Sequence, residues 1–167
     1  MLEIIDYLSA EVLGDWYEWL GQQPVSELLC SRYARGRREC YYGLGVTLQK
    51  SPRVYLAGQA DRVQVLGDCY LPGWDSALLC EYRAGVGINP HRDHTCFAAK
   101  AVMVNFGRAD FVEYLGREKV ITPLSDGVIV RLNTKILHGV HRVPNLRYSL
   151  TFRQLKPEYH PQALLLQ

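Results

Sequence analysis

Two histidines and an aspartate have the types and the spacing of a metal site. His91 and Asp93 form an HxD triplet, and in an extended segment residues two positions apart point to the same side. The third ligand must come from a distant segment, for which His138 is the natural candidate. Two imidazoles and one carboxylate on one face of an octahedron suit Fe(II), because three positions stay open for a chelating co-substrate and O2. The alternative is an ordinary surface His–Asp pair.

The segment Arg147–Arg153 alternates with a period of two residues. One face of the predicted strand is polar and carries Arg147, Ser149, Thr151 and Arg153. The other face is apolar and carries Tyr148, Leu150 and Phe152. A buried guanidinium needs an anion beside it, and a dicarboxylate ligand offers one to each arginine. The planar fork of arginine also matches a carboxylate in a way that lysine does not. The alternative is an exposed edge strand with solvated arginines.

The segment before the HxD triplet carries further polar groups. Leu78, Cys80 and Tyr82 fall on one face of a predicted strand over 76–82. The Tyr82 hydroxyl can donate a hydrogen bond to the same ligand as the arginines. A core tyrosine with a satisfied hydroxyl fits the sequence equally well.

Short strands are expected to position these residues. Segments rich in Val, Leu, Tyr and Phe, separated by turn residues, lie over 41–48, 63–66, 76–82, 98–106, 111–115, 119–121, 127–132 and 147–155. A helix precedes them, because apolar residues recur at helical spacing between Leu8 and Leu20, with Ser9 as a cap and Gly21 as a stop signal. Many closely spaced strands predict a closed or double-sheet β architecture, in one domain over 1–167.

The amino-acid composition indicates an ordinary globular protein and does not identify a binding partner. Hydrophobic residues make up 48% and charged residues 22% of the chain, and the net charge is +2, as in an ordinary globular protein. The five cysteines are odd in number and form no CxxC pair, which argues against a disulfide framework or a structural zinc site. With no secretory signal and no long apolar run, the expected location is the cytoplasm.

Residues 76–155 resemble the AlkB-like branch of the iron(II)/2-oxoglutarate dioxygenases. The resemblance rests on Leu-Leu-Cys-Glu-Tyr-x-x-Gly from Leu78 to Gly85, on the HxD triplet, on His138 and on RYSLTFRQ from Arg147. It implies a double-stranded β-helix (jelly-roll, cupin-like) core with flanking helices, and a reaction that uses Fe(II), 2-oxoglutarate and O2. It also implies roles for the site residues, in which His91, Asp93 and His138 bind the metal, Arg147 and Tyr82 hold the distal carboxylate, Arg153 lies near the chelated end, and Ser149 and Thr151 line the pocket.

The chain departs from the pattern of that branch at informative positions. Cys80 and Ser149 stand where its members commonly have Asn, and a thiol is a poorer hydrogen-bond donor than an amide. Co-substrate binding is therefore expected to be weaker or rearranged. No acid follows the HxD triplet, where His94 and Thr95 stand. Residues 1–75 carry no recognisable nucleotide-recognition lid.

The sequence leaves three functions open. One is oxidative demethylation or hydroxylation of an alkylated nucleobase or nucleotide, in which arginines between Arg32 and Arg38 contact phosphates and Tyr41, Tyr42 or Trp74 stacks on the base. The second is the same chemistry on a protein side chain or a small metabolite. The third is a non-catalytic jelly-roll binding module. His94 and His141 are not expected to bind the metal, because His94 points to the other face and His141 suits a turn or the surface.

Overall fold

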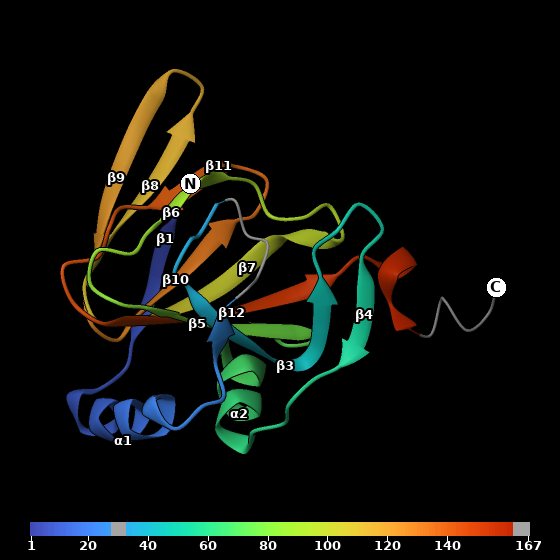
Figure 1. Ribbon diagram of the computed structural model, residues 1–167, viewed down its shortest axis with the longest axis horizontal. Coiled ribbons are helices and arrows are strands. Elements are labelled where there is room, and N and C mark those ends of the chain that lie inside the picture. Colours follow the sequence, from blue (N-terminus) through green and yellow to red (C-terminus); the bar gives the residue numbers. More distant parts are fainter. Residues whose placement is uncertain (28–32, 162–167) are drawn as a thin grey trace.

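The protein, described here from a computed structural model over residues 1–27 and 33–161, consists mainly of antiparallel strands (Figure 1). Its elements in chain order are β1 (Glu3–Tyr7), α1 (Ala10–Gly21), β2 (Ser26–Glu27), β3 (Arg38–Thr47), β4 (Arg53–Leu56), α2 (Asp61–Tyr70), β5 (Ser76–Tyr82), β6 (Ile88–His91), β7 (Phe97–Phe106), β8 (Ala109–Leu115), β9 (Glu118–Leu124), β10 (Val128–Asn133), β11 (Leu137–Val140), β12 (Arg147–Leu155) and the 3-10 turn η1 (Pro157–Tyr159).

The strands form two sheets. The larger has the order β1-β10-β7-β12-β5-β3-β2, with β4 paired to β3, and the smaller has the order β6-β11-β8-β9. Spatial neighbours such as β12 and β5 are far apart in the chain but pair antiparallel over their whole length. Such crossovers between two facing sheets are typical of a jelly roll, so the predicted fold with flanking helices is confirmed.

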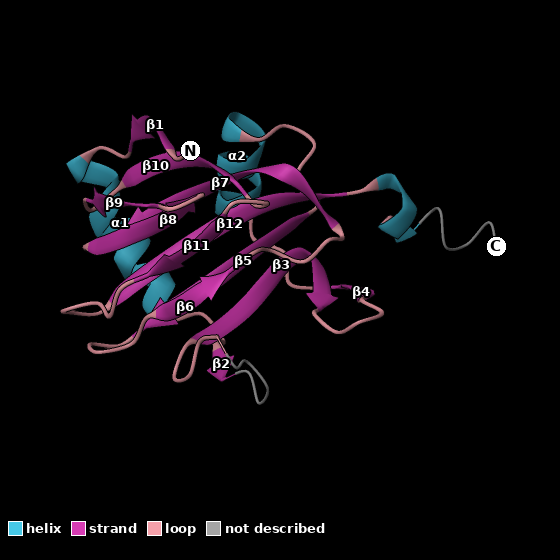
Figure 2. Ribbon diagram, turned by 90° about the horizontal axis from the view of Figure 1, so that it is seen from above, coloured by secondary structure: helices cyan, strands magenta, loops and turns pink. Residues whose placement is uncertain are grey.

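Apolar side chains cover both faces of the larger sheet. Leu79, Leu150 and Phe152 belong to a buried cluster with Trp16 of α1 and Val63 of α2. Both helices therefore cover the same face, and Figure 1 shows them on the side away from the β8–β9 hairpin, whereas Figure 2, seen from above, shows α1 behind the strands. A second buried cluster, which includes residues of β5, β7, β8 and β10, fills the space between the sheets. The polar site residues lie on this inner face.

The prediction of a strand over 63–66 is wrong, because these residues belong to α2. Val63-Gln-Val-Leu66 is an apolar-rich run of only four residues, and the longer segment buries Val63, Leu66 and Gly67 on one helical face. Gly67 is placed where a Cβ would collide with the rings of Trp74 and Phe152. The glycine thus lets the helix pack closely on the sheet. The predicted helix between Leu8 and Leu20 is confirmed as α1.

Candidate metal and co-substrate site

His91, Asp93 and His138 converge at one end of the space between the sheets. His91 is the last residue of β6 and pairs with His138 of β11, and Asp93 follows two positions later. The Asp93 Oδ1 lies 3.6 Å from His91 Nε2 and 3.5 Å from His138 Nε2. One ligand atom from each residue lies within 4.8 Å of the others. Adjacent ligands on an octahedral ion with bonds of about 2.1 Å are roughly 3 Å apart, so a small inward shift completes the site.

Backbone carbonyls fix the orientation of both imidazoles. His91 Nδ1 donates to the Asn89 carbonyl at 3.0 Å, and His138 Nδ1 donates to the Ile136 carbonyl at 2.7 Å. A carbonyl only accepts, so the proton sits on Nδ1 and the lone pair of each Nε2 faces Asp93. Such outer partners set the tautomer of metal-binding histidines. The arrangement fits a divalent metal such as Fe(II), as the donor set of two histidines and one carboxylate indicates.

Arg153 holds the third ligand in place. Its Nε donates to Asp93 Oδ2 at 2.6 Å, which leaves Oδ1 directed at the histidines. Burial alone would raise the pKa of the Asp93 carboxyl, but the Arg153 guanidinium holds this pKa well below its usual range. Asp93 is therefore an ionised ligand, and Arg153 positions it.

Replacing Asp93 with asparagine is expected to destabilise the metal-free protein at neutral pH. The folded-state pKa of Asp93 is depressed, so its contribution is present above the unfolded value of about 3.9 and is lost as the pH falls through the folded value. Removing one partner of a buried ion pair costs about 3–5 kcal/mol. Urea unfolding in the presence of a chelator should show a large difference in the free energy of unfolding between the wild type and Asp93→Asn at pH 7. This difference should narrow as the pH is lowered to 3. Exposed Asp110→Asn is the control, and equal stability of Asp93→Asn and wild type at pH 7 contradicts the assignment.

A cavity beside the metal ligands collects the remaining predicted residues. Tyr82, Cys80, Arg147, Ser149, Thr151 and Arg153 all line it, together with His91 and His138. The β12–β5 register explains this, because Arg147 lies opposite Tyr82 and Ser149 opposite Cys80. The cavity volume is only about 50 Å³, so a dicarboxylate fits when flexible side chains move outward.

Arg147 is fully buried with no carboxylate partner among the described residues. Its Nε donates to Asn105 Oδ1 at 2.8 Å, and its guanidinium lies 4.6 Å from the centre of the Tyr82 ring. Its Nη1 has no hydrogen-bond partner, and no carboxylate of the described chain lies within ion-pair distance of it. Burial, the largest effect, lowers the pKa of Arg147. A buried cation without an anion is costly, so the cavity is suited to an anionic ligand at this end.

Three solved structures share this architecture. OsALKBH1 is 14% identical, with a TM-score of 0.68 over 92% of this chain and 97% of that one. An oxidoreductase of the 2OG-Fe(II) oxygenase family from Burkholderia pseudomallei is 14% identical, with a TM-score of 0.69 over 91% and 84%. A prolyl hydroxylase from Trichoplax adhaerens, in complex with a hypoxia inducible factor peptide fragment, is 12% identical, with a TM-score of 0.70 over 99% and 87%.

The fold is that of the 2OG-Fe(II) oxygenases. The expected resemblance is thus confirmed at the level of the fold, and the His–Asp–His cluster is present within it. No protein-family model and no curated protein sequence matches the chain. In the part of the chain that the structure describes, no helix has the length and apolarity needed to cross a membrane.

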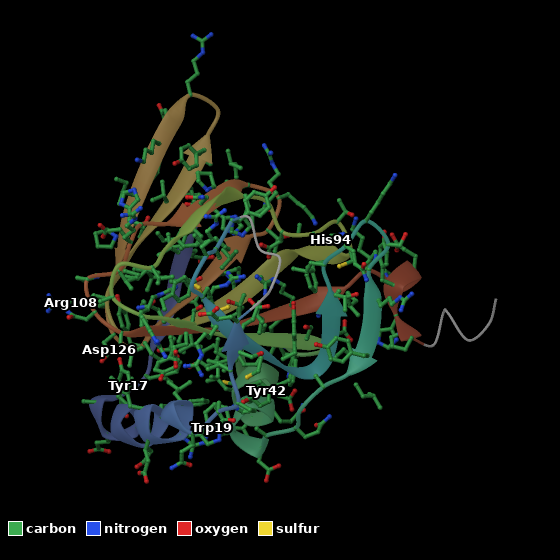
Figure 3. All side chains as sticks on the ribbon, in the orientation of Figure 1. Tyr17, Trp19, Tyr42, His94, Arg108 and Asp126 are labelled. Carbon is green, nitrogen blue, oxygen red and sulfur yellow. The ribbon has the colours of Figure 1, made fainter. Side chains whose placement is uncertain are left out.

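Several residues weighed for function lie outside this cavity. Tyr42 packs against Trp19 with ring centres 5.6 Å apart, on the side of the helices (Figure 3). Trp74 packs against Phe152 on the same side. Neither is placed to stack on a base beside the metal. Tyr41 faces inward from β3 and contacts Tyr55.

The two remaining histidines of interest are held away from the metal ligands. His94 Nε2 donates to the Gln49 carbonyl at 3.0 Å, and its Nδ1 accepts from the Cys96 amide at 3.1 Å. Both nitrogens are therefore occupied, and the residue lies toward the β3–β4 end of the molecule (Figure 3). His141 is exposed near Asp110, at 3.9 Å.

The arginines between Arg32 and Arg38 do not form one basic surface. Arg32 lies outside the described residues, and Arg35 is exposed. Arg38 pairs with Glu81 at 3.2 Å. Arg37 instead points into the cavity and forms an ion pair at 2.9 Å with buried Glu39. The sequence interpretation missed the inward direction of Arg37 and its pairing with Glu39.

Proposed function

We propose that this protein is an Fe(II)- and 2-oxoglutarate-dependent dioxygenase that hydroxylates or demethylates its substrate, with residues 1–167 acting as one oxygenase domain. The observation that carries the proposal is the pairing of two features in one cavity. One is a His–Asp–His cluster with its free ligand atoms converging, and the other is a buried guanidinium that lacks an anion. A structural jelly-roll module has no need of either feature.

Each site residue then has a role that follows from its contacts. His91, Asp93 and His138 would hold Fe(II), which when bound supplies the oxidative chemistry that couples decarboxylation of 2-oxoglutarate to C–H oxidation. Arg153 holds the Asp93 carboxylate in its ligating orientation and lies near the end of the co-substrate that chelates the metal. Arg147 and Tyr82 would bind the distal carboxylate at the other end of β12, where a planar fork can donate two hydrogen bonds.

Cys80, Ser149 and Thr151 line the cavity between these two ends. Burial raises the pKa of the Cys80 thiol to about 11, so the thiol stays neutral near pH 7. It adds no negative charge beside a dianionic co-substrate, although it donates hydrogen bonds poorly. Apolar contacts and the two hydroxyls are therefore proposed to guide the co-substrate chain.

An alkylated nucleobase or nucleotide is the substrate class we favour. A second cavity of about 600 Å³ lies beyond the shared residues Ile88 and Val140, and it is lined by Tyr33, Arg35 and Arg142. Cations and an aromatic ring are the groups that hold a phosphate and a base. A protein side chain is the second candidate, because one structural neighbour is a prolyl hydroxylase in complex with a peptide. A reducing cytoplasm is the proposed location, in line with the absence of any CxxC pair.

A succinate-release screen tests the proposal. The protein is incubated with Fe(II), ascorbate and 2-oxoglutarate, and with methylated oligonucleotides, methylated nucleotides or peptides. We expect succinate in stoichiometric amounts with formaldehyde for a methylated base. Arg35→Gln, at the rim of the second cavity, should raise KM for an anionic substrate while leaving the KM for 2-oxoglutarate unchanged. No 2-oxoglutarate consumption with any substrate class, together with no 2-oxoglutarate binding, contradicts the proposed function.

A further inference from the structure

Arg37 lies in the same cross-strand row as Tyr82 and Arg147. Arg38 pairs with Glu81 across β3 and β5, so Arg37, one position earlier in an antiparallel pair, falls opposite Tyr82. Tyr82 in turn lies opposite Arg147 of β12. The side chains of one such row point to the same face of the sheet. Arg37 Nη1 lies 3.5 Å from the Tyr82 hydroxyl, which places both guanidiniums around one phenol ring.

The charges in this row are not balanced. Arg147 is fully buried and the Arg37 side chain is only 11% exposed, and the one carboxylate that pairs with either of them in the described chain is Glu39. Burial is the largest cause of the lowered pKa of Arg147, and repulsion by Arg37 adds to it. Arg37 Nε, like Arg147 Nη1, is buried with no hydrogen-bond partner. Of the two inward-facing guanidiniums, that of Arg37 has an internal anion and that of Arg147 has none, and each keeps one buried donor without a partner.

The adjacent cross-strand row contains few strong hydrogen-bond donors, so an additional donor is useful at this end of the cavity. Glu39, Cys80 and Ser149 lie opposite one another on β3, β5 and β12. Cys80 and Ser149 are the positions at which the resembling branch has amides. A thiol and a hydroxyl offer fewer and weaker donors than two amides. The guanidinium of Arg37 brings charged N–H groups to the same region from the neighbouring strand.

We infer that Arg37 is a second guanidinium ligand for the distal carboxylate of 2-oxoglutarate, binding it together with Arg147 and Tyr82. This inference rests on the proposed function, because it assigns one more residue to the same co-substrate. Glu39 keeps Arg37 at the cavity wall through the 2.9 Å ion pair. The distal end of the site is thereby made from three strands, β3, β5 and β12.

Binding of two 2-oxo acids to metal-loaded protein tests this assignment. 2-Oxoglutarate and 2-oxobutyrate, which lacks the distal carboxylate, are titrated calorimetrically into the Mn(II)-loaded protein and its Arg37→Gln and Arg37→Lys variants. Loss of a charge-assisted hydrogen bond should weaken 2-oxoglutarate binding about ten- to hundredfold. Arg37→Lys should recover part of the loss. The affinity for 2-oxobutyrate should stay the same in all three proteins, because the chelated end of the molecule is unchanged.

Arg38→Gln is the matched control, since this neighbouring arginine points away from the cavity toward Glu81 and the Val25 carbonyl. It should bind both acids like the wild type. Equal 2-oxoglutarate affinity of Arg37→Gln and wild type overturns the inference, and so does a parallel loss for both acids, which would indicate a general structural defect. A wild-type protein that binds neither acid overturns the proposed function instead, so the two failures are distinguishable.

Discussion

His138→Ala is expected to abolish 2-oxoglutarate turnover and to weaken metal binding by more than a hundredfold. Loss of an outer partner of a metal ligand typically costs about 10–100-fold, and here a direct ligand is removed. The His138 Nε2 lone pair is one of the three that converge at the site, because its Nδ1 proton is committed to the Ile136 carbonyl. The remaining His91 and Asp93 would leave the metal with two protein ligands and a disordered coordination.

Metal affinity and succinate release, measured on the same preparations, check this prediction. His141→Ala is the matched control, because His141 is an exposed histidine three residues away whose nearest acid, Asp110, lies at 3.9 Å. It should retain both metal binding and turnover. The His138 ring also stacks on Phe111 with ring centres 5.4 Å apart, so thermal unfolding of both variants is needed to separate lost ligation from lost packing. Retained Fe(II) affinity in a folded His138→Ala protein contradicts the metal assignment.

The sequence predicted those parts of the molecule in which local pattern and tertiary structure agree. The strand over 147–155 is found as predicted, because strict alternation persists for the seven residues from Arg147 to Arg153. Its apolar face lies under the helices and its polar face lines the cavity. The predicted grouping of His91, Asp93 and His138 is likewise present in the structure. An HxD triplet places two of these groups together through local geometry alone.

What the sequence did not predict depends on pairing between distant strands. Asn105 interrupts an apolar run in β7, and its partner Arg147 is apparent only from the register in which Ser149 lies opposite Asn105. Arg37 was interpreted as one of several arginines that contact phosphates. Its inward direction depends on the pairing of β3 with β5, which the local sequence does not reveal. The helix α2 was mistaken for a strand, because a short apolar-rich run of four residues fits either a helix or a strand. The local alternation of polar and apolar residues indicates which side chains share a face of a strand. The pairing register decides which side chains of neighbouring strands lie opposite one another.

Arg147→Met is expected to weaken 2-oxoglutarate binding by at least about a hundredfold, because two charge-assisted hydrogen bonds to the distal carboxylate are lost. The same substitution is expected to leave the ligand-free protein at least as stable as the wild type. Arg147 is fully buried and has no carboxylate partner among the described residues, so its charge is costly in the absence of an anion. The hydrogen bond lost from Asn105 Oδ1 offsets this gain by about 1–3 kcal/mol.

Thermal unfolding with and without Mn(II) and saturating 2-oxoglutarate separates the two effects. Binding to the folded state stabilises it by mass action, so the wild-type Tm should rise on addition of the acid while the Tm of Arg147→Met should not. Arg131→Met is the control, because Arg131 pairs with Glu3 at the surface and should respond to the acid like the wild type. Strong destabilisation of the ligand-free Arg147→Met protein, with retained affinity for 2-oxoglutarate, would mean that this arginine is a structural residue. A stable variant that no longer binds the acid indicates that the buried charge is kept for its ligand, at a cost to the stability of the ligand-free fold.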